Sequence, residues 1–411
     1  MKKIILFSLI IFCFSCSKNN ETAQWRGDNR DGKYLETGLM KSWPKGGPAL
    51  EWAIDDSESG YGAEQSKGGI GNGYGSPVVT SNRVYINGEI DGIGYLFAID
   101  LKGNILWKSP YGKEWTESYE GSRSAPTVIG GLIYVCSGLG EIVCFDAEKG
   151  NKIWSKNMIS DFHGKNTPFG YSESLLIDDS TLFASPGGAD TNVIALDRFN
   201  GGLKWVSKAK GTISAYCSPL MIKLAKRKLL VTFSQNEFLG LDAQDGKLLW
   251  SQKQDTNCTI HGNTPIFENG FIYYSAGCGN GTSKIELSED GSSIKEIWRS
   301  SGLINIMGGF VKLDNNIFGA SENKWVSIDA SSGKLVDSLN FTKGITISAD
   351  GMLYCYNEKG EVALVNPFDK MKIISSFKIT KGTKEHFSHP VIKNGLLYIR
   401  HGKSLMAYKI K

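Results

Sequence analysis

The hydrophobic and polar positions of the chain follow a phrase that repeats. A short apolar run ends in Asp, a Gly follows four residues later, and a Trp follows four residues after the Gly. The complete copies contain Asp146, Gly150 and Trp154; Asp197, Gly201 and Trp205; and Asp242, Gly246 and Trp250; a shorter copy contains Asp100, Gly103 and Trp107. Successive Trp residues through Trp298 are 47, 51, 45 and 48 positions apart, and this period predicts the four-stranded blades of a β-propeller.

Each part of the phrase predicts a local structure. The apolar run is a strand, the Asp accepts hydrogen bonds from backbone N–H groups of the following turn, and the Gly supplies the positive φ that closes the turn. The Trp lies on the outer strand, where its ring can wedge between neighbouring blades. We expect this blade-docking role for Trp52, Trp107, Trp154, Trp205, Trp250 and Trp298.

Other signals mark the first two strands of each repeat. Most repeats open with a Pro ahead of an apolar run, as at Pro77, Pro126 and Pro219, because Pro is tolerated as the first residue of a strand. Blades one to five are predicted at 76–111, 123–158, 170–209, 216–254 and 261–300. Blades six and seven are degenerate, with Asp337 and Ile374 at the Trp position, and weaker docking is expected there.

The last repeat lacks a strand that the start of the chain can supply. Only three strands fit before Lys411, whereas Ala49–Ile54, which carries Trp52, resembles a lone fourth strand. Pairing of the two would close the ring and remove exposed sheet edges. We therefore predict an all-β fold, an eight-bladed propeller of four-stranded antiparallel blades over 49–411.

The residues before the propeller predict export. Lys2 and Lys3 precede an apolar stretch too short to span a membrane, so 1–15 are expected to be a signal peptide. Cys16 then stands where a lipoprotein is acylated, although Cys13 fits that pattern loosely and an ordinary signal peptide is the alternative. Residues 16–48 are read as a tether and an ordered, aromatic-rich lead-in that caps the propeller; the alternative is a mobile tether. The expected location is the periplasmic face of the envelope, on the outer membrane.

Composition narrows the possible functions. The formal net charge is +4 and no basic stripe is interleaved with aromatic residues, so nucleic acid is not an expected partner. No CxxC occurs, which gives no support to a zinc ribbon or a thioredoxin-type site. The pairs Cys136 and Cys144, and Cys258 and Cys278, could form disulfides after export, with buried free thiols as the alternative.

The repeated Asp, Gly and Trp phrase resembles the pyrroloquinoline-quinone-like propeller repeats. That superfamily includes quinoprotein alcohol dehydrogenases and the outer-membrane assembly lipoprotein BamB, so the resemblance implies the fold and leaves the chemistry open. The enzymatic branch uses a disulfide between adjacent Cys residues, a Trp, a calcium held by Glu and Asn, and an Asp base. No Cys-Cys dipeptide occurs here. We carry over no catalytic residue and expect no cofactor.

Candidate binding residues map to one face of the predicted propeller, where loops lead into the innermost strands and second strands turn into third strands. All five His residues lie there, and such polar loop residues could form a ligand or partner site. The set comprises Arg123, His163, Glu173, His261, Asn263, Glu322, His386, His389 and His401. His386, His389 and His401 could supply imidazoles to a metal, but hydrogen-bonded loop residues without a ligand are the favoured interpretation.

The Gly-rich run at 68–75 does not predict a nucleotide site. A phosphate-binding loop leads from a strand into a helix, whereas this run leads into the strand at Val78 and Val79. We expect it to be a flexible entry to blade one.

Two functional hypotheses follow. The first is a monomeric, lipid-tethered, non-catalytic binding or scaffold protein that engages another envelope protein or a polymer. The alternative is an exported dehydrogenase of alcohols or sugars that depends on pyrroloquinoline quinone and calcium.

Overall fold

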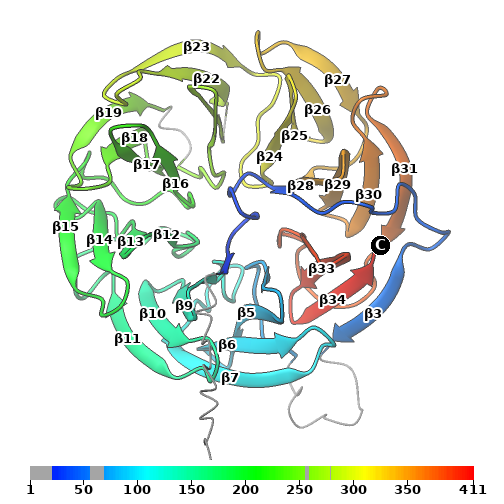
Figure 1. Ribbon diagram of the computed structural model, residues 1–411, viewed down its shortest axis with the longest axis horizontal. Coiled ribbons are helices and arrows are strands. Elements are labelled where there is room, and N and C mark those ends of the chain that lie inside the picture. Colours follow the sequence, from blue (N-terminus) through cyan, green and yellow to red (C-terminus); the bar gives the residue numbers. More distant parts are fainter. Residues whose placement is uncertain (1–20, 56–68, 255–258, 278) are drawn as a thin grey trace, which may run out of the picture.

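The predicted eight-bladed propeller is confirmed. The computed structural model describes residues 21–55, 69–254, 259–277 and 279–411, and all the regular elements in these ranges are β-strands. They form eight sheets arranged around a central axis (Figure 1). Within the described ranges no helix has the length and apolar character needed to cross a membrane.

The blades follow one another in chain order, and each runs from the axis outward. Blades 1 to 4 contain β4 (Val78–Val79), β5 (Arg83–Ile90), β6 (Ile93–Asp100) and β7 (Ile105–Lys113); β8 (Thr127–Ile129), β9 (Leu132–Cys136), β10 (Glu141–Asp146) and β11 (Lys152–Asn157); β12 (Leu176–Asp178), β13 (Thr181–Ala184), β14 (Val193–Asp197) and β15 (Leu203–Ser207); and β16 (Leu220–Lys223), β17 (Lys228–Ser234), β18 (Glu237–Asp242) and β19 (Leu248–Lys253).

The second half of the ring has the same order. Blades 5 to 8 contain β20 (Ile266–Glu268), β21 (Phe271–Ala276), β22 (Gly281–Leu287) and β23 (Ile294–Ser300); β24 (Phe310–Leu313), β25 (Asn316–Ser321), β26 (Lys324–Asp329) and β27 (Leu335–Leu339); β28 (Gly344–Ala349), β29 (Met352–Asn357), β30 (Glu361–Asn366) and β31 (Lys372–Lys378); and β32 (Val391–Lys393), β33 (Leu396–His401), β34 (Ser404–Lys409) and β3 (Ala49–Ile54).

The last blade closes as predicted. Strand β3 pairs antiparallel with β34, with Ala49 opposite Lys409 and Ile54 opposite Leu405. Trp52 donates its indole N–H to the carbonyl oxygen of Leu101 in blade 1, at 2.9 Å. Strand β3 therefore joins the last blade to the first.

The docking Trp residues and the turn Gly residues fit together across each joint between blades. Trp107 of blade 1 donates its indole N–H to the carbonyl of Glu148 in blade 2, at 3.0 Å. Its ring lies against Gly150, where a Cβ would stand 2.6 Å from the ring and where φ is 72°. The Gly of the phrase thus serves two purposes: it permits the turn and it makes room for the Trp of the preceding blade.

The docking position of blade 7 is Ser375 and not Ile374, which the sequence spacing predicted. In blade 2 the docking residue Trp154 pairs with Cys144, next to a bulge. The same register in blade 7 pairs Ser375 with Leu364, and the bulge leaves Ile374 unpaired and 39% exposed. The turn before β31 is one residue longer than the corresponding turn in blades 2, 3, 4 and 6, and fixed spacing along the sequence could not reveal this.

The two joints that follow blades 6 and 7 contain a Trp from another position. Between blades 6 and 7, buried Trp325 donates its N–H to the Thr346 hydroxyl at 2.8 Å. Between blades 7 and 8, Trp43 of the lead-in packs 5.9 Å from Tyr354, measured between ring centroids, and donates its backbone N–H to the Ser375 hydroxyl at 2.9 Å. The weaker docking expected from sequence is therefore offset by indoles supplied from elsewhere.

The lead-in enters the central channel, whereas the sequence predicted a cap on the propeller. Strand β1 (Thr22–Ala23) pairs with β8 of blade 2, and β2 (Lys33–Tyr34) runs parallel to β28 of blade 7. Figure 1 shows this dark blue segment crossing the centre of the ring. We call residues 22–34 the plug. The chain enters and leaves by the face that carries the turns between first and second strands, which we call the plug face, and the opposite face is the mouth.

Candidate functional site

Two arginines fix the plug inside the channel. Arg26 and Arg30 are 3% and 2% exposed. Arg26 donates to the carbonyl oxygens of Phe310 at 2.7 Å and Thr346 at 3.2 Å, and Arg30 donates to the carbonyl oxygen of Ser174 at 2.6 Å. Buried guanidinium groups need such acceptors, because an unpaired buried charge is costly. The plug is therefore joined to blades on several sides of the channel.

The Arg26 site also requires glycine on both sides. A Cβ at Gly309 would stand 1.9 Å from Nη1 of Arg26, and a Cβ at Gly32 would stand 2.3 Å from Nη2. Gly32 adopts a φ of 78°. Close approach and a left-handed backbone both favour glycine here.

His389 completes the contact between the plug and the mouth. Burial, followed by the charge of Arg26, lowers the pKa of His389 well below its usual value, so its ring is neutral. Its Nδ1 accepts from Nη1 of Arg26 at 2.9 Å, which leaves Nε2 to donate to the Met307 carbonyl at 3.1 Å. The ring of Trp25 lies 4.5 Å from the His389 ring, and its N–H donates to the Thr264 hydroxyl. Trp25 thus forms a floor across the channel.

Above this floor the mouth narrows into a cavity of about 320 Å³, which we call the aromatic funnel. Its wall includes five rings that contact one another in sequence and that we call the aromatic arc. Centroid distances are 5.7 Å from Tyr74 to Phe387, 6.0 Å from Phe387 to Tyr119, 6.2 Å from Tyr119 to Phe169 and 6.3 Å from Phe169 to Tyr216. Met307, Ile306 and Ile260 complete the apolar wall. The funnel offers mainly ring and aliphatic surface.

Arg123 is the charged residue of the funnel. Its Nη2 donates to the carbonyl oxygens of Ser118 and Tyr119 at 2.8 and 2.6 Å, and its guanidinium lies 5.4 Å from the centre of the Trp115 ring. Its buried Nε has no hydrogen-bond partner among the described residues. Burial lowers the pKa of Arg123, and the nearby carboxyl of Glu114 opposes that shift.

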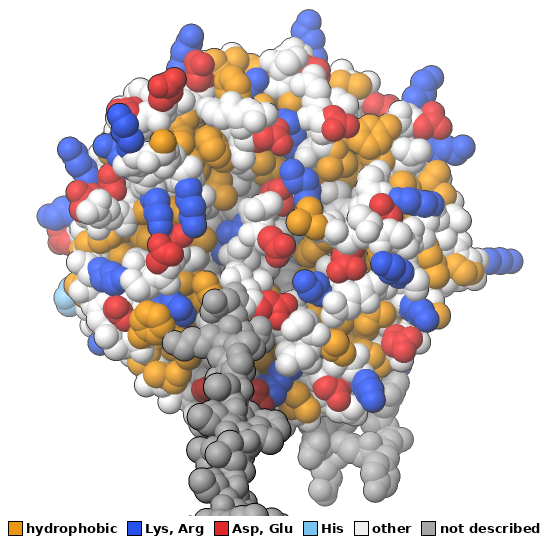
Figure 2. All heavy atoms as spheres, viewed as in Figure 1, with side chains coloured by type: hydrophobic (Ala, Val, Ile, Leu, Met, Phe, Trp, Pro, Cys, Tyr) orange, Lys and Arg blue, Asp and Glu red, His pale blue; other side chains and the backbone are white. Residues whose placement is uncertain are grey.

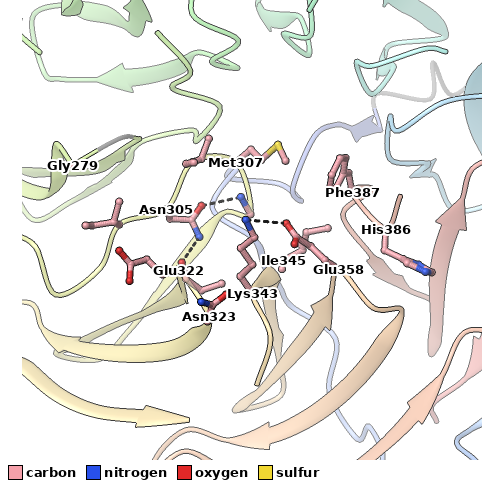
Figure 3. Close-up of a pocket in the computed structure, with 15 residues that line it drawn as sticks. Gly279, Asn305, Met307, Glu322, Asn323, Lys343, Ile345, Glu358, His386 and Phe387 are labelled. Atoms are coloured by element: carbon pink, nitrogen blue, oxygen red, sulfur yellow. Dashed lines mark hydrogen bonds and ion pairs between the residues drawn. The ribbon is translucent and has the colours of Figure 1, made fainter. Parts of the chain in front are cut away.

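A second cavity of about 580 Å³ opens beside the funnel at blades 6 and 7 (Figure 3). In contrast to the funnel, this cavity is lined by charged side chains. Lys343 and Glu358 point toward each other, with Nζ of Lys343 3.5 Å from Oε1 of Glu358. Glu322 lies on the rim, and Asn305 is held below by its own hydrogen bonds to the carbonyls of Gly309 and Ala320. The mouth therefore combines an aromatic half with a polar half.

The predicted candidate residues do not converge on one site. Arg123 and His389 line the aromatic funnel, whereas Glu322 and His386 line the second cavity. His163 is exposed in the loop before β12. His261 is fully buried, with Nε2 at 3.2 Å from the Gln235 carbonyl, and burial lowers its pKa to about 4.

His386, His389 and His401, for which a metal site was the less favoured interpretation, each face different groups. His386 and His401 stack with ring centroids 3.7 Å apart, and both nitrogens of His401 face the backbone carbonyls of Lys381 and Lys384. His389 faces the plug. Among the described residues no three His, Cys, Asp or Glu side chains gather as they would around a metal.

Glu173 and Asn263 are buried below the funnel. Oε1 of Glu173 accepts from the backbone N–H of Ser185 at 2.6 Å, Oε2 has no partner among the described residues, and burial raises the pKa of Glu173 to about 7. The Asn263 amide is occupied by the Ser275 and Asn305 carbonyls and by the Gly309 N–H.

One buried oxygen of the candidate residues has no partner among the described residues and could bind a cation such as calcium. The described site offers Glu173 alone as a buried oxygen ligand without a partner, and the guanidinium of Arg30 lies close enough to influence it electrostatically. Cys136, Cys144, Cys217 and Cys355 are free and buried, so Cys136 and Cys144 are the buried free thiols that the sequence analysis gave as the alternative to a disulfide. Cys258 and Cys278 lie outside the described residues.

The Gly-rich entry to blade 1 proves to be packed against a buried arginine. The carbonyls of Gly71 and Gly75 accept from Arg400 at 3.0 and 3.1 Å. A Cβ at Gly73 would stand 2.4 Å from Nη2 of Arg400. Close backbone approach, rather than the expected flexibility, explains these glycines.

Sequence reasoning missed most of the funnel, although a signal was present. The residue three positions before the Pro that opens a blade lines the funnel in five blades: Tyr74, Arg123, Tyr216, Gly262 and Phe387. Only Arg123 was among the candidates. Polar residues were expected at the mouth, whereas the funnel is built mainly from aromatic rings.

The fold and the mouth together define a class, the eight-bladed propellers built from pyrroloquinoline-quinone-like repeats. The family model described as "Outer membrane protein assembly factor BamB" matches residues 92–336. The chain therefore belongs to this family.

Individual relatives are more distant. The curated BamB of Bordetella pertussis (strain Tohama I) is 30% identical over 113 residues, which is 26% of this chain and 26% of that protein. The match thus spans about a quarter of that relative. The crystal structure of BamB from Moraxella catarrhalis has a TM-score of 0.61 at 15% identity and covers 88% of this chain and 98% of its own. A europium-containing methanol dehydrogenase has a TM-score of 0.68 at 12% identity, with coverage of 92% and 90%. At these identities the two structures show the fold alone.

Proposed function

We propose that this protein is a non-catalytic scaffold of the cell envelope that binds another protein through the mouth of the propeller. The observation that carries this proposal is the aromatic arc, set around a channel that the plug closes. Tyr, Trp, Phe, Met and Arg are the residues enriched at the centres of protein interfaces, and they dominate the funnel. Membership of the family described as an outer membrane assembly factor supports an envelope role.

A lipid anchor at Cys16 would orient the molecule. Glu21 is the first described residue, and Thr22 pairs with Ile129 at the plug face. Five extended residues reach at most roughly 17 Å. An anchored Cys16 would therefore hold the plug face near the membrane and turn the mouth away from it, toward a partner.

Lys and Arg are interspersed with Asp and Glu on the face shown in Figure 2, without the basic patch that nucleic acid requires.

Affinity capture tests the proposal. The tagged chain, exported and processed by its own signal, would be compared with the double variant Tyr119→Ser, Phe169→Ser after cross-linking in intact cells. We expect a specific envelope protein to be captured by the wild type and to be reduced at least tenfold with the variant. Leu203→Ser, at a 53% exposed position on the outer strand of blade 3, is the matched control and should leave capture unchanged. Equal capture by wild type and double variant would contradict the proposal.

A further inference from the structure

We propose that the aromatic funnel binds one aromatic side chain from a loop of the partner protein, together with an adjacent carboxylate that pairs with Arg123. This inference rests on the proposed function and deepens it, because it states the chemistry that the partner must present. Three features of the funnel support it: the volume of the cavity, the hydrogen bonds that its polar groups already make, and the charge of Arg123.

The size of the funnel fits a single bulky side chain. Its volume of about 320 Å³ is near the lower end of the range of roughly 300–1,000 Å³ found for small-molecule sites. A helix, about 10 Å wide with its side chains, does not enter such a space. One ring with its flanking backbone does.

The wall of the funnel offers ring surface to such a side chain. Tyr119 is 48% exposed and Met307 is 43% exposed, so apolar surface remains in water until a partner covers it. The rings of the aromatic arc meet one another at tilted or edge-on angles, which is also how an additional ring would pack. Trp25 presents its ring from below, since its N–H is already bonded to Thr264.

Most polar groups of the funnel are already engaged. His389 uses one nitrogen for Arg26 and the other for the Met307 carbonyl, and the Tyr74 hydroxyl donates to Glu385 at 2.6 Å. A sugar ring would bring several hydroxyls and would leave most of them without partners. The funnel therefore favours a ligand that is apolar over most of its surface.

Arg123 is the polar group of the funnel that could still bind a ligand. Its hydrogen bonds go to backbone carbonyls, and Nε has no partner among the described residues. The nearby carboxyls have other partners: Glu114 accepts from the Tyr111 hydroxyl and the Trp115 N–H, Glu385 accepts from Tyr74, and Glu120 pairs with Lys384. A carboxylate on the ligand would form charge-assisted hydrogen bonds with this guanidinium. The complement of the funnel is therefore an aromatic residue next to Asp or Glu.

Short peptides test this chemistry directly. The probe is a fluorescein-labelled, end-capped peptide Gly-Ser-Trp-Asp-Gly-Ser, titrated with the full chain and followed by fluorescence polarisation. We expect a dissociation constant below about 1 mM, at least tenfold weaker binding when the Trp of the peptide is Ala, and about tenfold weaker binding when its Asp is Asn. Arg123→Gln should remove the preference for Asp over Asn while keeping the requirement for Trp. Tyr119→Ser should weaken binding of every peptide, and Leu203→Ser should change nothing.

Several results would overturn the inference. These are absence of saturable binding at millimolar protein, equal affinity for the Asp and Asn peptides, and Tyr119-dependent binding of maltohexaose or pyrroloquinoline quinone in place of the peptide. The variant Arg123→Lys, which keeps the charge, shows whether loss of binding reflects misfolding. If affinity capture finds a partner but the peptides do not bind, the proposed function stands and this inference falls. If the peptides bind but capture finds no partner, the funnel has the inferred chemistry and the proposed function falls.

Discussion

The joints between blades differ in where their Trp comes from. After blade 2, Trp154 of the blade's own outer strand closes the joint and donates its N–H to the Arg198 carbonyl of the next blade at 2.9 Å. After blade 7, Trp43 comes from the lead-in, more than three hundred residues away along the chain. Both indoles pack on the aromatic residue of a second strand, Tyr134 and Tyr354. The difference shows that the lead-in is a structural part of the ring. The lead-in also supplies Trp25, the floor of the funnel.

The largest effect is expected from removing these indoles. Trp43→Ala should lower the free energy of unfolding by about 3–5 kcal/mol, as for other buried Trp residues. Trp154→Ala should cost a similar amount, since the two side chains are 6% and 9% exposed. Chemical denaturation of the two variants would check this. A loss below about 1 kcal/mol for Trp43→Ala alone would show that the lead-in is dispensable for the ring.

A somewhat smaller effect is expected from Arg26. Arg26→Met keeps much of the side-chain volume but leaves the carbonyls of Phe310 and Thr346 without their donor, at a cost of about 2–3 kcal/mol. Lys45→Met, at an exposed position of the same lead-in, is the matched control. Thermal unfolding followed by circular dichroism measures both. Equal melting temperatures for the two variants would mean that the plug is not held by its arginine.

The buried carboxyls predict how stability depends on pH. Burial raises the pKa of Glu114 and of Glu173 from 4.5 to about 7. The folded protein therefore retains protons that the unfolded chain releases between these values, and stability falls as pH rises from about 4.5 to 7. Each group contributes up to about 3 kcal/mol to this fall.

Glu173→Gln isolates one of the two contributions. The variant should lose less stability than the wild type between pH 5 and pH 7, measured by urea denaturation at a series of pH values. Glu289→Gln, at an exposed site, should keep the wild-type profile. A Glu173→Gln profile parallel to that of the wild type would contradict a buried, protonated carboxyl.

The smallest effect tests the corrected register of blade 7. Ile374 is a bulge residue, 39% exposed, so Ile374→Ser should change stability by no more than about 0.5 kcal/mol. Denaturation midpoints of this variant and of Ile153→Ser, which is exposed beside Trp154 in blade 2, should shift alike. A loss of several kcal/mol for Ile374→Ser would restore the docking position that spacing predicted.

The sequence was sufficient for the repeat and for the closure, because both depend on local chemistry that recurs. Asp, Gly and Trp at fixed spacing specify a turn and a docking ring, and Ala49–Ile54 carries that ring without the rest of a blade. The displaced register of blade 7 could not be read, since one additional turn residue shifts which side chain faces the joint.

The plug and the funnel depend on contacts between distant residues. The partners of Arg26 are the carbonyls of Phe310 and Thr346, and a carbonyl carries no mark in the sequence. Likewise the aromatic arc exists only because several loops meet at the axis. Of the polar residues expected there, some line the second cavity, as Glu322 does, and others are buried, as Asn263 is.

Hydrogen exchange of the plug tests the central claim most directly. If residues 22–34 fill the channel, the Gly32 amide, which donates to the Arg26 carbonyl at 2.9 Å, should exchange as slowly as the amides of β28 beside it. Mass spectrometry of peptides covering 22–34 and 344–349 in the full-length chain would give both rates. Matching protection is the predicted result. Complete exchange of 22–34 within seconds, with β28 still protected, would mean that the lead-in lies outside the channel and that the funnel has no floor.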